Sequence, residues 1–431
     1  MDGFLQHCRQ PLMPAVLICL LVCRASMSMA AQTVVSTAAE LAAAVKTSSP
    51  GDTILLKDGV YALSSSGTIE VRTDSLAIRS LSGDRTAVVI EGWGVQADGH
   101  NGFWVAANDV TIADLTIQNV SWHCIQTDVD VDRLTVRNCV LRDAGEQILK
   151  VPAASGADHS DEGLVEGCRF EYSARVGPQY YIGGIDVHRG RGWIVRDNHF
   201  RYIRSPGGSI AEHAIHFWND SRDTLVERNH IVDCDRGIGF GLGSSTHTGG
   251  TIRNNMIFHT GNPLPDGSKG FDDVGIGLES APGARVFNNT VYFVHSYSAI
   301  EYRFSSTTGV EIANNLTNRP IMQRNGAAAV LVSNITDARS DWFVNATAGD
   351  LHLAFPVDTV VDQGSAVDLL VDDFDRQLRP QGAGVDIGAD EVVFCRVDRD
   401  DDGDVDGADL ADFVKNFDGA CLADFGHAFG G

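Results

Sequence analysis

A carboxylate and an imidazole lie two positions apart at Asp186 and His188, in the segment GGIDVHRG. If this segment is a β-strand, both side chains point from the same face. His216 lies in the next segment of similar pattern and would stack beside Asp186. A histidine beside a carboxylate can take up or release a proton near neutral pH. Asp186, His188 and His216 are therefore candidate catalytic residues, and a structural network is the alternative for such a pair.

Five further polar or aromatic side chains are predicted to share this face. Trp218 can stack on a sugar ring, and Arg236 and Arg303 can bind anionic groups. Glu279 and Glu301 offer two carboxyl groups on neighbouring strands. Glycoside hydrolysis needs such a pair about 5–5.5 Å apart for retention or about 6.5–9.5 Å apart for inversion. Salt bridges to Arg303 are the structural alternative for the two glutamates.

These residues lie in a repeat that extends from about residue 125 to about residue 335. The first part of each unit contains an isoleucine, as in GGIDVHR, HAIHFWN, RGIGFGL, VGIGLES and AIEYRF. The second part contains an asparagine, as in VRDNHF, VERNHI, IRNNMI, VFNNTV and IANNLT. A repeat of short strands and turns predicts a β-solenoid, in which equivalent residues stack about 4.8 Å apart.

Alignment of the units assigns the faces of the first strands. The aligned residues are Ile125, Ile148, Ile185, Ile215, Ile238, Ile276, Ile300 and Ile321. If they point inward, so does a second apolar set, two positions later: Val187, Phe217, Phe240, Leu278 and Tyr302. The candidate residues then point outward at two ends of a groove, with a floor of Gly239, Gly241 and Gly277 between them. Asp186 and Glu301 are four rungs apart, about 19 Å, which suits an extended polymer.

The recurring asparagines predict a structural ladder. Their side-chain amides can bond to one another and to the turn backbone when they stack. The members are Asn198, Asn229, Asn255, Asn289 and Asn315. Cys139 and Cys168 occupy the same position in earlier units, where either buried thiols or a disulfide would fit.

Lys150 poses a problem of register. Simple alternation from Ile148 buries its side chain, and an unpaired buried lysine is costly. Either Lys150 pairs with Glu146, or this rung shifts by one residue and Lys150 joins the outward face. The shift is the preferred interpretation.

Composition and charge limit the partners and the compartment. The 431 residues carry a formal net charge of -24, which argues against nucleic acid. Residues 1–30 resemble a secretory signal: Arg9 precedes the apolar run from Pro14 to Cys23, and Ser28 to Ala30 suits cleavage. No other segment is apolar enough to span a membrane. We therefore expect a secreted or cell-surface monomer in which disulfides can form.

An acidic loop near the C-terminus predicts calcium binding. Its carboxylates occupy the ligand positions of a calcium loop, with Gly403 at the sixth position. The candidate ligands are Asp398, Asp400, Asp402, Asp404, Asp406 and Asp409. A helix, LADFVKNF, follows the loop, and Cys395 and Cys421 flank it. The segment 392–431 resembles a single dockerin repeat, and this resemblance implies a docking or cell-surface partner.

The two ends of residues 32–391 carry a resemblance in architecture. The opening ELAAAVKTSSPGDTILLKDGVYAL and the closing DFDRQLRPQGAGVDIGADE resemble those of secreted pectate-lyase-like proteins. These include polysaccharide lyases of the chondroitinase B and alginate lyase kind. The resemblance implies an all-β fold, a right-handed single-stranded parallel β-helix, followed by the small helical calcium-loop module.

The candidate groove carries a second resemblance. GIDVHRGRGWIVRDN is similar to the Asp-Pro-His segment of mannuronan C5-epimerases and to an Arg-His segment of alginate lyases, and GEQILKV is similar to their lysine-bearing rung. The resemblance implies that Lys150 and His188 are acid/base groups, Asp186 their catalytic or substrate-carboxylate partner, and Arg189 a second cation. It also implies a polyuronate substrate and proton abstraction at C5, with calcium as a second cation in the groove. A glycoside hydrolase and a non-catalytic glycan-binding protein are the alternatives.

Overall fold

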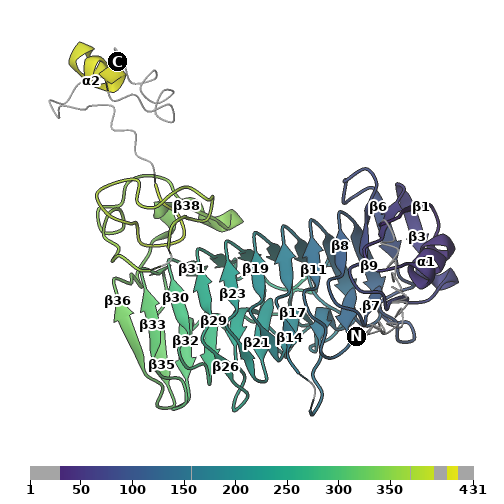
Figure 1. Cartoon of the computed structure of the whole chain (residues 1–431). Coiled ribbons are helices and arrows are strands. Elements are labelled where there is room, and N and C mark those ends of the chain that lie inside the picture. Colours follow the sequence, from purple (N-terminus) through teal and green to yellow (C-terminus); the bar gives the residue numbers. More distant parts are fainter. Residues whose placement is uncertain (1–29, 157, 369, 393–404, 416–431) are drawn as a thin grey trace, which may run out of the picture.

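The chain forms a long coil of short parallel strands (Figure 1). The computed structural model describes residues 30–156, 158–368, 370–392 and 405–415. The predicted signal segment and the ligands Asp398, Asp400, Asp402 and Asp404 lie outside these residues. Among the described residues, no helix has the length and hydropathy needed to cross a bilayer.

Three parallel sheets run along the coil within the described residues. The first, named here the long sheet, has twelve strands: β1 (Gln32–Val35), β2 (Thr53–Leu56), β5 (Ala77–Ser80), β8 (Thr111–Ala113), β11 (Thr135–Arg137), β15 (Leu164–Glu166), β19 (Ile194–Arg196), β23 (Leu225–Glu227), β27 (Thr251–Arg253), β30 (Arg285–Phe287), β33 (Val310–Ala313) and β36 (Ala329–Val332).

The second sheet, named here the groove sheet, carries the candidate site. Its ten strands are β4 (Ile69–Val71), β7 (Phe103–Val105), β10 (Ile125–Thr127), β13 (Gln147–Val151), β17 (Gly183–His188), β21 (Ile215–Trp218), β25 (Arg236–Phe240), β29 (Val274–Glu279), β32 (Ser298–Arg303) and β35 (Ile321–Arg324).

The third sheet also has ten strands. They are β3 (Gly59–Ala62), β6 (Val88–Glu91), β9 (Thr116–Val120), β12 (Val140–Ala144), β16 (Arg169–Glu171), β20 (His199–Arg201), β24 (His230–Val232), β28 (Met256–His259), β31 (Thr290–Phe293) and β34 (Leu316–Thr317). A four-stranded sheet lies between the groove and long sheets along the chain: β14 (Ser160–Asp161), β18 (Gly190–Arg191), β22 (Ser221–Arg222) and β26 (His247–Thr248).

Each turn of the coil visits the sheets in the same order. The chain passes from β17 through β18 to β19 and β20, and then returns to the groove sheet at β21. Every described strand pair is parallel except β37 (Phe343–Asn345) with β38 (Asp350–Leu353). Strands that neighbour one another in a sheet therefore come from successive turns, and residues about one repeat apart in sequence become neighbours.

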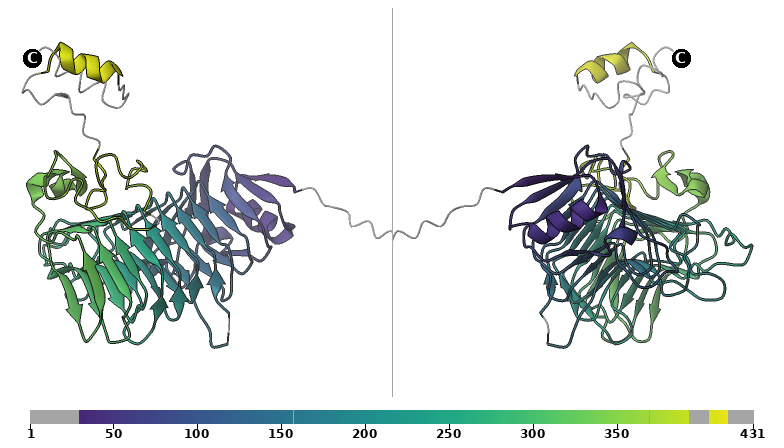
Figure 2. Two further views of the ribbon diagram at one scale, coloured as in Figure 1. Left: turned by 60° about the vertical axis from the view of Figure 1, so that its left-hand side comes forward. Right: turned by 90° about the vertical axis from the view of Figure 1, so that its right-hand side faces the viewer.

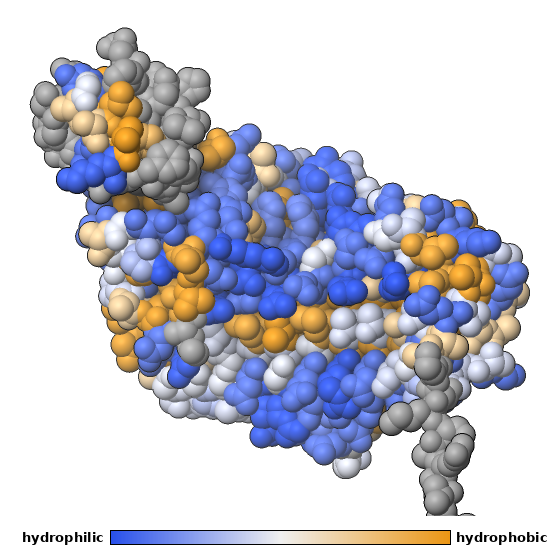
Figure 3. Space-filling view, turned by 45° about the horizontal axis from the view of Figure 1, so that its top comes forward, coloured by the Kyte–Doolittle hydropathy of each residue, from blue (hydrophilic) through white to orange (hydrophobic). Residues whose placement is uncertain are grey.

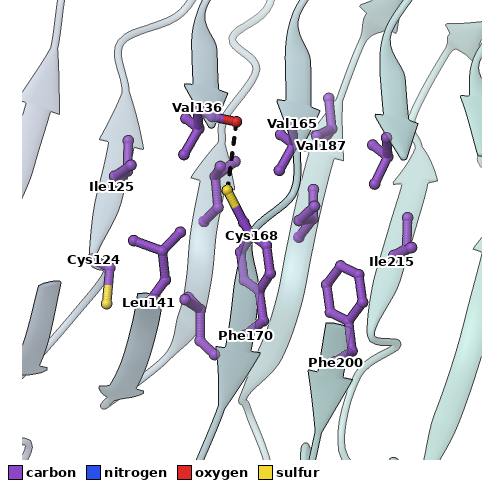
Figure 4. Close-up of a cluster of buried hydrophobic side chains, with 14 of the residues drawn as sticks. Cys124, Ile125, Val136, Leu141, Val165, Cys168, Phe170, Val187, Phe200 and Ile215 are labelled. Carbon is purple, nitrogen blue, oxygen red and sulfur yellow. Dashed lines mark hydrogen bonds between the residues drawn. The ribbon is translucent and has the colours of Figure 1, made fainter. Parts of the chain in front are cut away.

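The core fills the interior of the coil with the predicted inward residues. Val187, Phe217, Phe240 and Leu278 have no exposed surface, and Tyr302 is 6% exposed. Figure 4 shows part of this core, where Phe170 and Phe200 stack with ring centroids 4.7 Å apart. The Cys168 thiol beside them donates to the Val136 carbonyl over 3.5 Å. Cys139 and Cys168 are buried free thiols, so the disulfide alternative is wrong.

The asparagine ladder is confirmed at the turn between the long and third sheets. Each side-chain nitrogen donates to the side-chain oxygen of the next rung, from Asn198 to Asn229, Asn255, Asn289, Asn315 and finally Asn334, over 2.9–3.0 Å. The residue before each of these asparagines has a positive φ, between 49° and 58°. That backbone favours asparagine, aspartate and glycine, which explains the Asp-Asn and Asn-Asn pairs.

The N-terminal end of the coil is covered by α1 (Ala38–Thr47), which lies across it in the right-hand view of Figure 2. Thr37 caps the helix by accepting from the Glu40 N–H, and Glu40 in turn accepts from the Ser36 N–H. Ala38, Leu41 and Val45 point into the core. The helix thus shields apolar side chains that the first rung would otherwise expose.

A closing segment after the last rung packs against the outside of the third sheet. It contains β37, β38 and the 3-10 helices η2 (Ser340–Trp342) and η3 (Ala346–Ala348); a further one, η1 (Leu63–Ser65), follows β3. Phe343, Leu351 and Ile387 join Phe258 and Leu316 of the coil in a second hydrophobic cluster.

The face turned forward in Figure 3 is mostly hydrophilic, with hydrophobic side chains in patches near its ends and in a band between them.

The described part of the C-terminal segment contains α2 (Gly407–Lys415). Asp406 accepts from the Ala408 N–H at its start, and Asp409 accepts from the Asp406 N–H. Both carboxylates therefore cap the helix that follows the predicted calcium loop.

We predict that Asn229→Ala destabilises the coil by about 3 kcal/mol. The reason is that Asn229 is fully buried and its side chain bonds to both neighbouring rungs, so truncation leaves buried partners unsatisfied. Urea unfolding followed by circular dichroism measures the loss. Asn262→Ala is the control, because Asn262 is exposed; an equal loss in both variants would refute the role of the ladder.

We also predict a pH-dependent contribution from His352 of β38. Its Nε2 lies 3.0 Å from Asp375 and its Nδ1 2.5 Å from Asp350. The hydrogen bond with Asp375 is the main cause that raises the pKa of His352 to about 9, against an opposing effect of burial. Its stabilisation is therefore complete below about pH 6.5 and disappears as the pH rises through about 9.

His352→Gln should accordingly lower the free energy of unfolding by roughly 1 kcal/mol at pH 6, after screening of a partly exposed group, and by less at pH 10. Urea unfolding at the two pH values measures this difference. The exposed His295 provides the control variant His295→Gln. A loss for His352→Gln that is the same at both pH values would contradict the assignment.

Candidate functional site

Strand pairing in the groove sheet places Lys150 on the outward face. β13 pairs with β17 so that Leu149 lies beside Ile185 and Lys150 beside Asp186. The one-residue shift of this rung is confirmed, and the alignment of Ile148 with the other isoleucines is wrong. Ile148 and Leu149 are both fully buried, so both side chains pack in the core despite the shift. The register of the other aligned isoleucines is as predicted, from Ile185 through Ile215, Ile238, Ile276 and Ile300 to Ile321.

Lys150, Asp186, His188 and Trp218 form one hydrogen-bonded cluster, named here the lysine cluster. The Lys150 ammonium donates to Asp186 Oδ2 and, over 3.0 Å, to His188 Nε2. The Trp218 indole N–H donates to Asp186 Oδ1 over 2.7 Å. Because the ammonium is a donor only, His188 Nε2 is the acceptor in this contact. Asp186 is thus the centre of the cluster, since it accepts from both Lys150 and Trp218.

The cluster keeps Asp186 charged although the side chain is only 5% exposed. Burial alone would raise the pKa of Asp186. The closeness of His188, whose Nε2 lies 3.6 Å from Asp186 Oδ2, and the charge of Lys150 outweigh that effect and hold the pKa of Asp186 well below its usual range. The Lys150 and His188 side chains remain 11% and 17% exposed, so a ligand lying over the sheet reaches both.

His216 lies beside the lysine cluster but is deeply buried. Its Nδ1 is 4.0 Å from Asp186 and 3.6 Å from Glu212, and its Nε2 donates to the Gly241 carbonyl over 3.1 Å. Burial lowers the pKa of His216, so the ring is neutral at pH 7. The indole of Trp218 stacks on it, with ring centroids 5.5 Å apart. His216 is therefore close to Asp186, but its side chain is too deeply buried to contact a large ligand directly.

The glycine floor is not open to a ligand, which corrects the sequence-based expectation. A Cβ on Gly239 would lie 2.7 Å from the imidazole of His213, and one on Gly277 would lie 3.7 Å from it. His213 comes from the loop before β21, and Asp235 holds that loop by accepting from the Ser205 and Ala211 N–H groups. The absence of side chains on the floor makes room for His213.

The charged residues at the far end of the groove are paired. Glu279 accepts from Arg303 over 2.9 Å and from the Gly243 N–H over 2.7 Å. Glu301 accepts from Arg324 over 3.0 Å and from the Ser298 hydroxyl over 2.8 Å. The structure therefore has the salt-bridge alternative for Glu279 and Arg303, while Glu301 pairs with Arg324.

Two predicted cations lie at the edges of the groove. Arg236 donates to Asp273 over 2.9 Å and is neutralised by it. Arg189 follows His188 directly and is 4.0 Å from Asp220, too far for a hydrogen bond. Its Nε has no hydrogen-bond partner among the described residues. Arg189 thus forms a long ion pair with Asp220, and its side chain, next to His188 in the chain, remains 27% exposed.

Several residues near the site were missed from the sequence. His123 Nε2 lies 3.6 Å from Glu146, and burial lowers the pKa of His123 to about 4. Glu212 and His213 lie in the loop before β21, and their closeness to His216 in EHAIH was the available signal. Two exposed aromatic side chains, Trp122 and Tyr180, lie just before β10 and β17.

Comparison with known proteins identifies the class of this chain. Residues 101–317, half of the 431, match the family described as "Right handed beta helix region", and the chain belongs to that family. Pectate lyase Pel9A has the same fold, with a TM-score of 0.59 and 13% identity over 85% of this chain and 97% of that chain. The fold is thus the predicted pectate-lyase-like right-handed parallel β-helix.

Other solved structures are similar at lower scores. An alginate lyase from Paenibacillus sp. str. FPU-7 has a TM-score of 0.43 and 15% identity over 70% of this chain and 97% of that one. Pectin methylesterase PemA from Erwinia chrysanthemi has a TM-score of 0.34 and 14% identity over 62% and 80%. No curated protein matches the sequence.

The buried ion pair of the lysine cluster generates a stability prediction. Asp186→Ala leaves the Lys150 ammonium without its counter-charge in a site that is 11% exposed, and we expect a loss of about 3–5 kcal/mol. Adding Lys150→Met removes the uncompensated charge and should recover at least about 1 kcal/mol. Urea unfolding of both single variants and the double variant measures the coupling. Additive losses would show that the pair does not interact.

Proposed function

We propose that this chain is an exported enzyme that acts on a uronate-containing polysaccharide by removing the proton on C5. The observation that carries the proposal is the lysine cluster, which joins an ammonium, a carboxylate and an imidazole on two adjacent rungs of a sheet face. The likeness in fold to a pectate lyase supports a carbohydrate substrate. The exposed aromatic residues at the edge of the same sheet suit sugar rings.

The first step needs a base and a way to neutralise the substrate carboxylate. His188 Nε2 accepts from Lys150 in the cluster and, once Lys150 releases it, can accept the C5 proton. Arg189 can bind the uronate carboxylate through its guanidinium, because its side chain is 27% exposed. The resulting negative charge develops beside the Lys150 ammonium, which stabilises it. Asp186 holds Lys150 in place.

Two outcomes follow from the same intermediate. In elimination, the C4–O bond breaks, a double bond forms between C4 and C5, and the departing oxygen takes a proton from Lys150 or from the imidazolium of His188. In epimerisation, C5 receives a proton from the opposite face and no bond of the chain breaks. Lys150 can serve as the acid, because its ammonium carries the proton and is held by hydrogen bonds to Asp186 and His188.

The hydrolase alternative is less well supported. Glu279 and Glu301 each accept two hydrogen bonds, one of them from an arginine. A nucleophile or general acid needs a free carboxyl oxygen facing the substrate and, for the acid, a raised pKa. Both carboxyl groups are instead occupied by these contacts with arginine.

The C-terminal module and export belong to the same proposal. The spacing of Asp398, Asp400, Asp402, Asp404, Asp406 and Asp409 supports calcium binding, and capping of α2 by the last two supports a defined start of that helix. A docking or cell-surface partner follows from the resemblance to a dockerin repeat. Secretion follows from residues 1–30.

Incubation with a panel of polyuronates tests the proposal. We expect new absorbance from unsaturated products, or a changed uronate composition without cleavage. His188→Ala and Lys150→Ala should each lower kcat/KM by at least about 10²-fold, since they remove acid/base groups. Arg133→Ala is the control, because Arg133 pairs with Asp109 on the long-sheet side of the coil. New reducing ends without absorbance would indicate a hydrolase, and no change in any substrate would favour a binding protein.

A further inference from the structure

Glu212, His213 and His216 converge on one point behind the lysine cluster. The ligand-type atoms of the three side chains all lie within 4.8 Å of one another. His216 Nδ1 is 3.6 Å from Glu212 Oε2, and the two imidazole rings have centroids 4.5 Å apart. Two donor atoms bound tetrahedrally at about 2.0–2.1 Å from one ion lie roughly 3.3 Å apart. The observed spacings therefore approach those of a metal site.

His216 is held in the tautomer that a ligand needs. Its Nε2 donates to the Gly241 carbonyl over 3.1 Å, so the unprotonated atom of the neutral ring is Nδ1. That lone pair faces Glu212. A hydrogen bond from the second ring nitrogen to a backbone carbonyl is the usual support of a metal-bound histidine.

The other two donors lack any partner in the described residues. His213 Nδ1 and Glu212 Oε2 are buried polar atoms without a hydrogen bond. His213 is only 7% exposed and His216 only 1%. Buried polar atoms are rarely left unsatisfied, because each one costs roughly 1–3 kcal/mol. Buried atoms without a partner, in three side chains whose donor atoms lie within 4.8 Å of one another, indicate a missing partner that accepts electron pairs.

We propose that Glu212, His213 and His216 bind one divalent transition-metal ion of the zinc class. Two imidazoles and one carboxylate suit zinc and related ions, whereas calcium prefers oxygen ligands alone. A fourth position remains for water or for a substrate oxygen. This donor set therefore differs from that of the calcium ion expected in the groove.

The surrounding structure explains how His213 reaches the site. Gly239 and Gly277 leave space for its ring, and Asp235 fixes the preceding loop through two backbone N–H groups. A side chain on Gly239 would occupy the position of the imidazole. The glycines of the groove thus leave the room that His213 needs to bind the metal ion.

The metal site also bears on the proposed function. His216 Nδ1 lies 4.0 Å from Asp186 Oδ1, so the ion would sit next to the lysine cluster. A divalent ion there adds positive charge in the groove of an acidic protein and can help to neutralise a uronate carboxylate. This consequence rests on the proposed function, whereas metal binding does not.

Metal binding is tested on the full chain after removal of metals with a chelator. Calorimetric titration with Zn²⁺ should show binding that is at least tenfold weaker in His213→Ala. Glu212→Gln keeps nearly the same shape and is partly exposed, so it should fold normally and also weaken binding. Gly239→Ala should weaken binding without removing a ligand, because it displaces His213. The exposed His295 gives the matched control His295→Ala, which should bind like the parent.

Two further measurements make the test independent of activity. Co²⁺ should give a visible absorption band typical of four- or five-coordinate nitrogen and oxygen ligation in the parent and not in His213→Ala. Zn²⁺ should raise the Tm of the parent more than that of Glu212→Gln. Equal Zn²⁺ affinity in the parent, His213→Ala and Glu212→Gln, or no binding to the parent, overturns the proposal. Failure of the polyuronate assay alone contradicts the proposed function and leaves the metal site intact.

Discussion

Parallel pairing between successive turns is the constraint on which the rest of this structure depends. Backbone hydrogen bonds hold neighbouring strands about 4.8 Å apart, so residues one turn apart in sequence become direct neighbours. Lys150 and Asp186 are 36 residues apart and form the central ion pair of the candidate site in this way. The asparagine ladder keeps the turns in register, because a slip by one residue would break every side-chain bond along it.

The candidate site follows from where such a coil can place charge. Its interior is mainly apolar, so most ionisable groups lie on the outer sheet faces. Glu212 and His213 of the loop before β21 lie against His216, which is 1% exposed, and burial lowers the pKa of His216. The same loop brings His213 onto the glycines of β25 and β29. The strands of the coil therefore place the candidate residues, and the loop before β21 adds side chains that bury some of them.

The repeat was sufficient to predict the fold and most of the side-chain faces, because alternation along a strand is a local property. Val187, Phe217 and Phe240 are buried as expected. Register across an irregular rung is decided by packing of the core, and this is why the alignment of Ile148 failed while Lys150 still reached the outward face. His213 could not be placed, since it lies in a loop outside the repeat, and its position depends on a contact with Gly239 in the next rung. The pairing of Glu301 with Arg324 was missed for a related reason, because it joins two rungs through long, flexible side chains.

The ladder also has a consequence for how such a chain can change over time. Each turn pairs its strands with those of its two neighbours, and the ladder asparagines make the same kind of bond from one turn to the next. If one whole turn is lost or duplicated, the turns that become neighbours can still pair their strands and join their asparagines. Loss of a single residue shifts the register and breaks these contacts. The groove sheet can therefore lengthen or shorten only in steps of about 4.8 Å, the spacing of its strands.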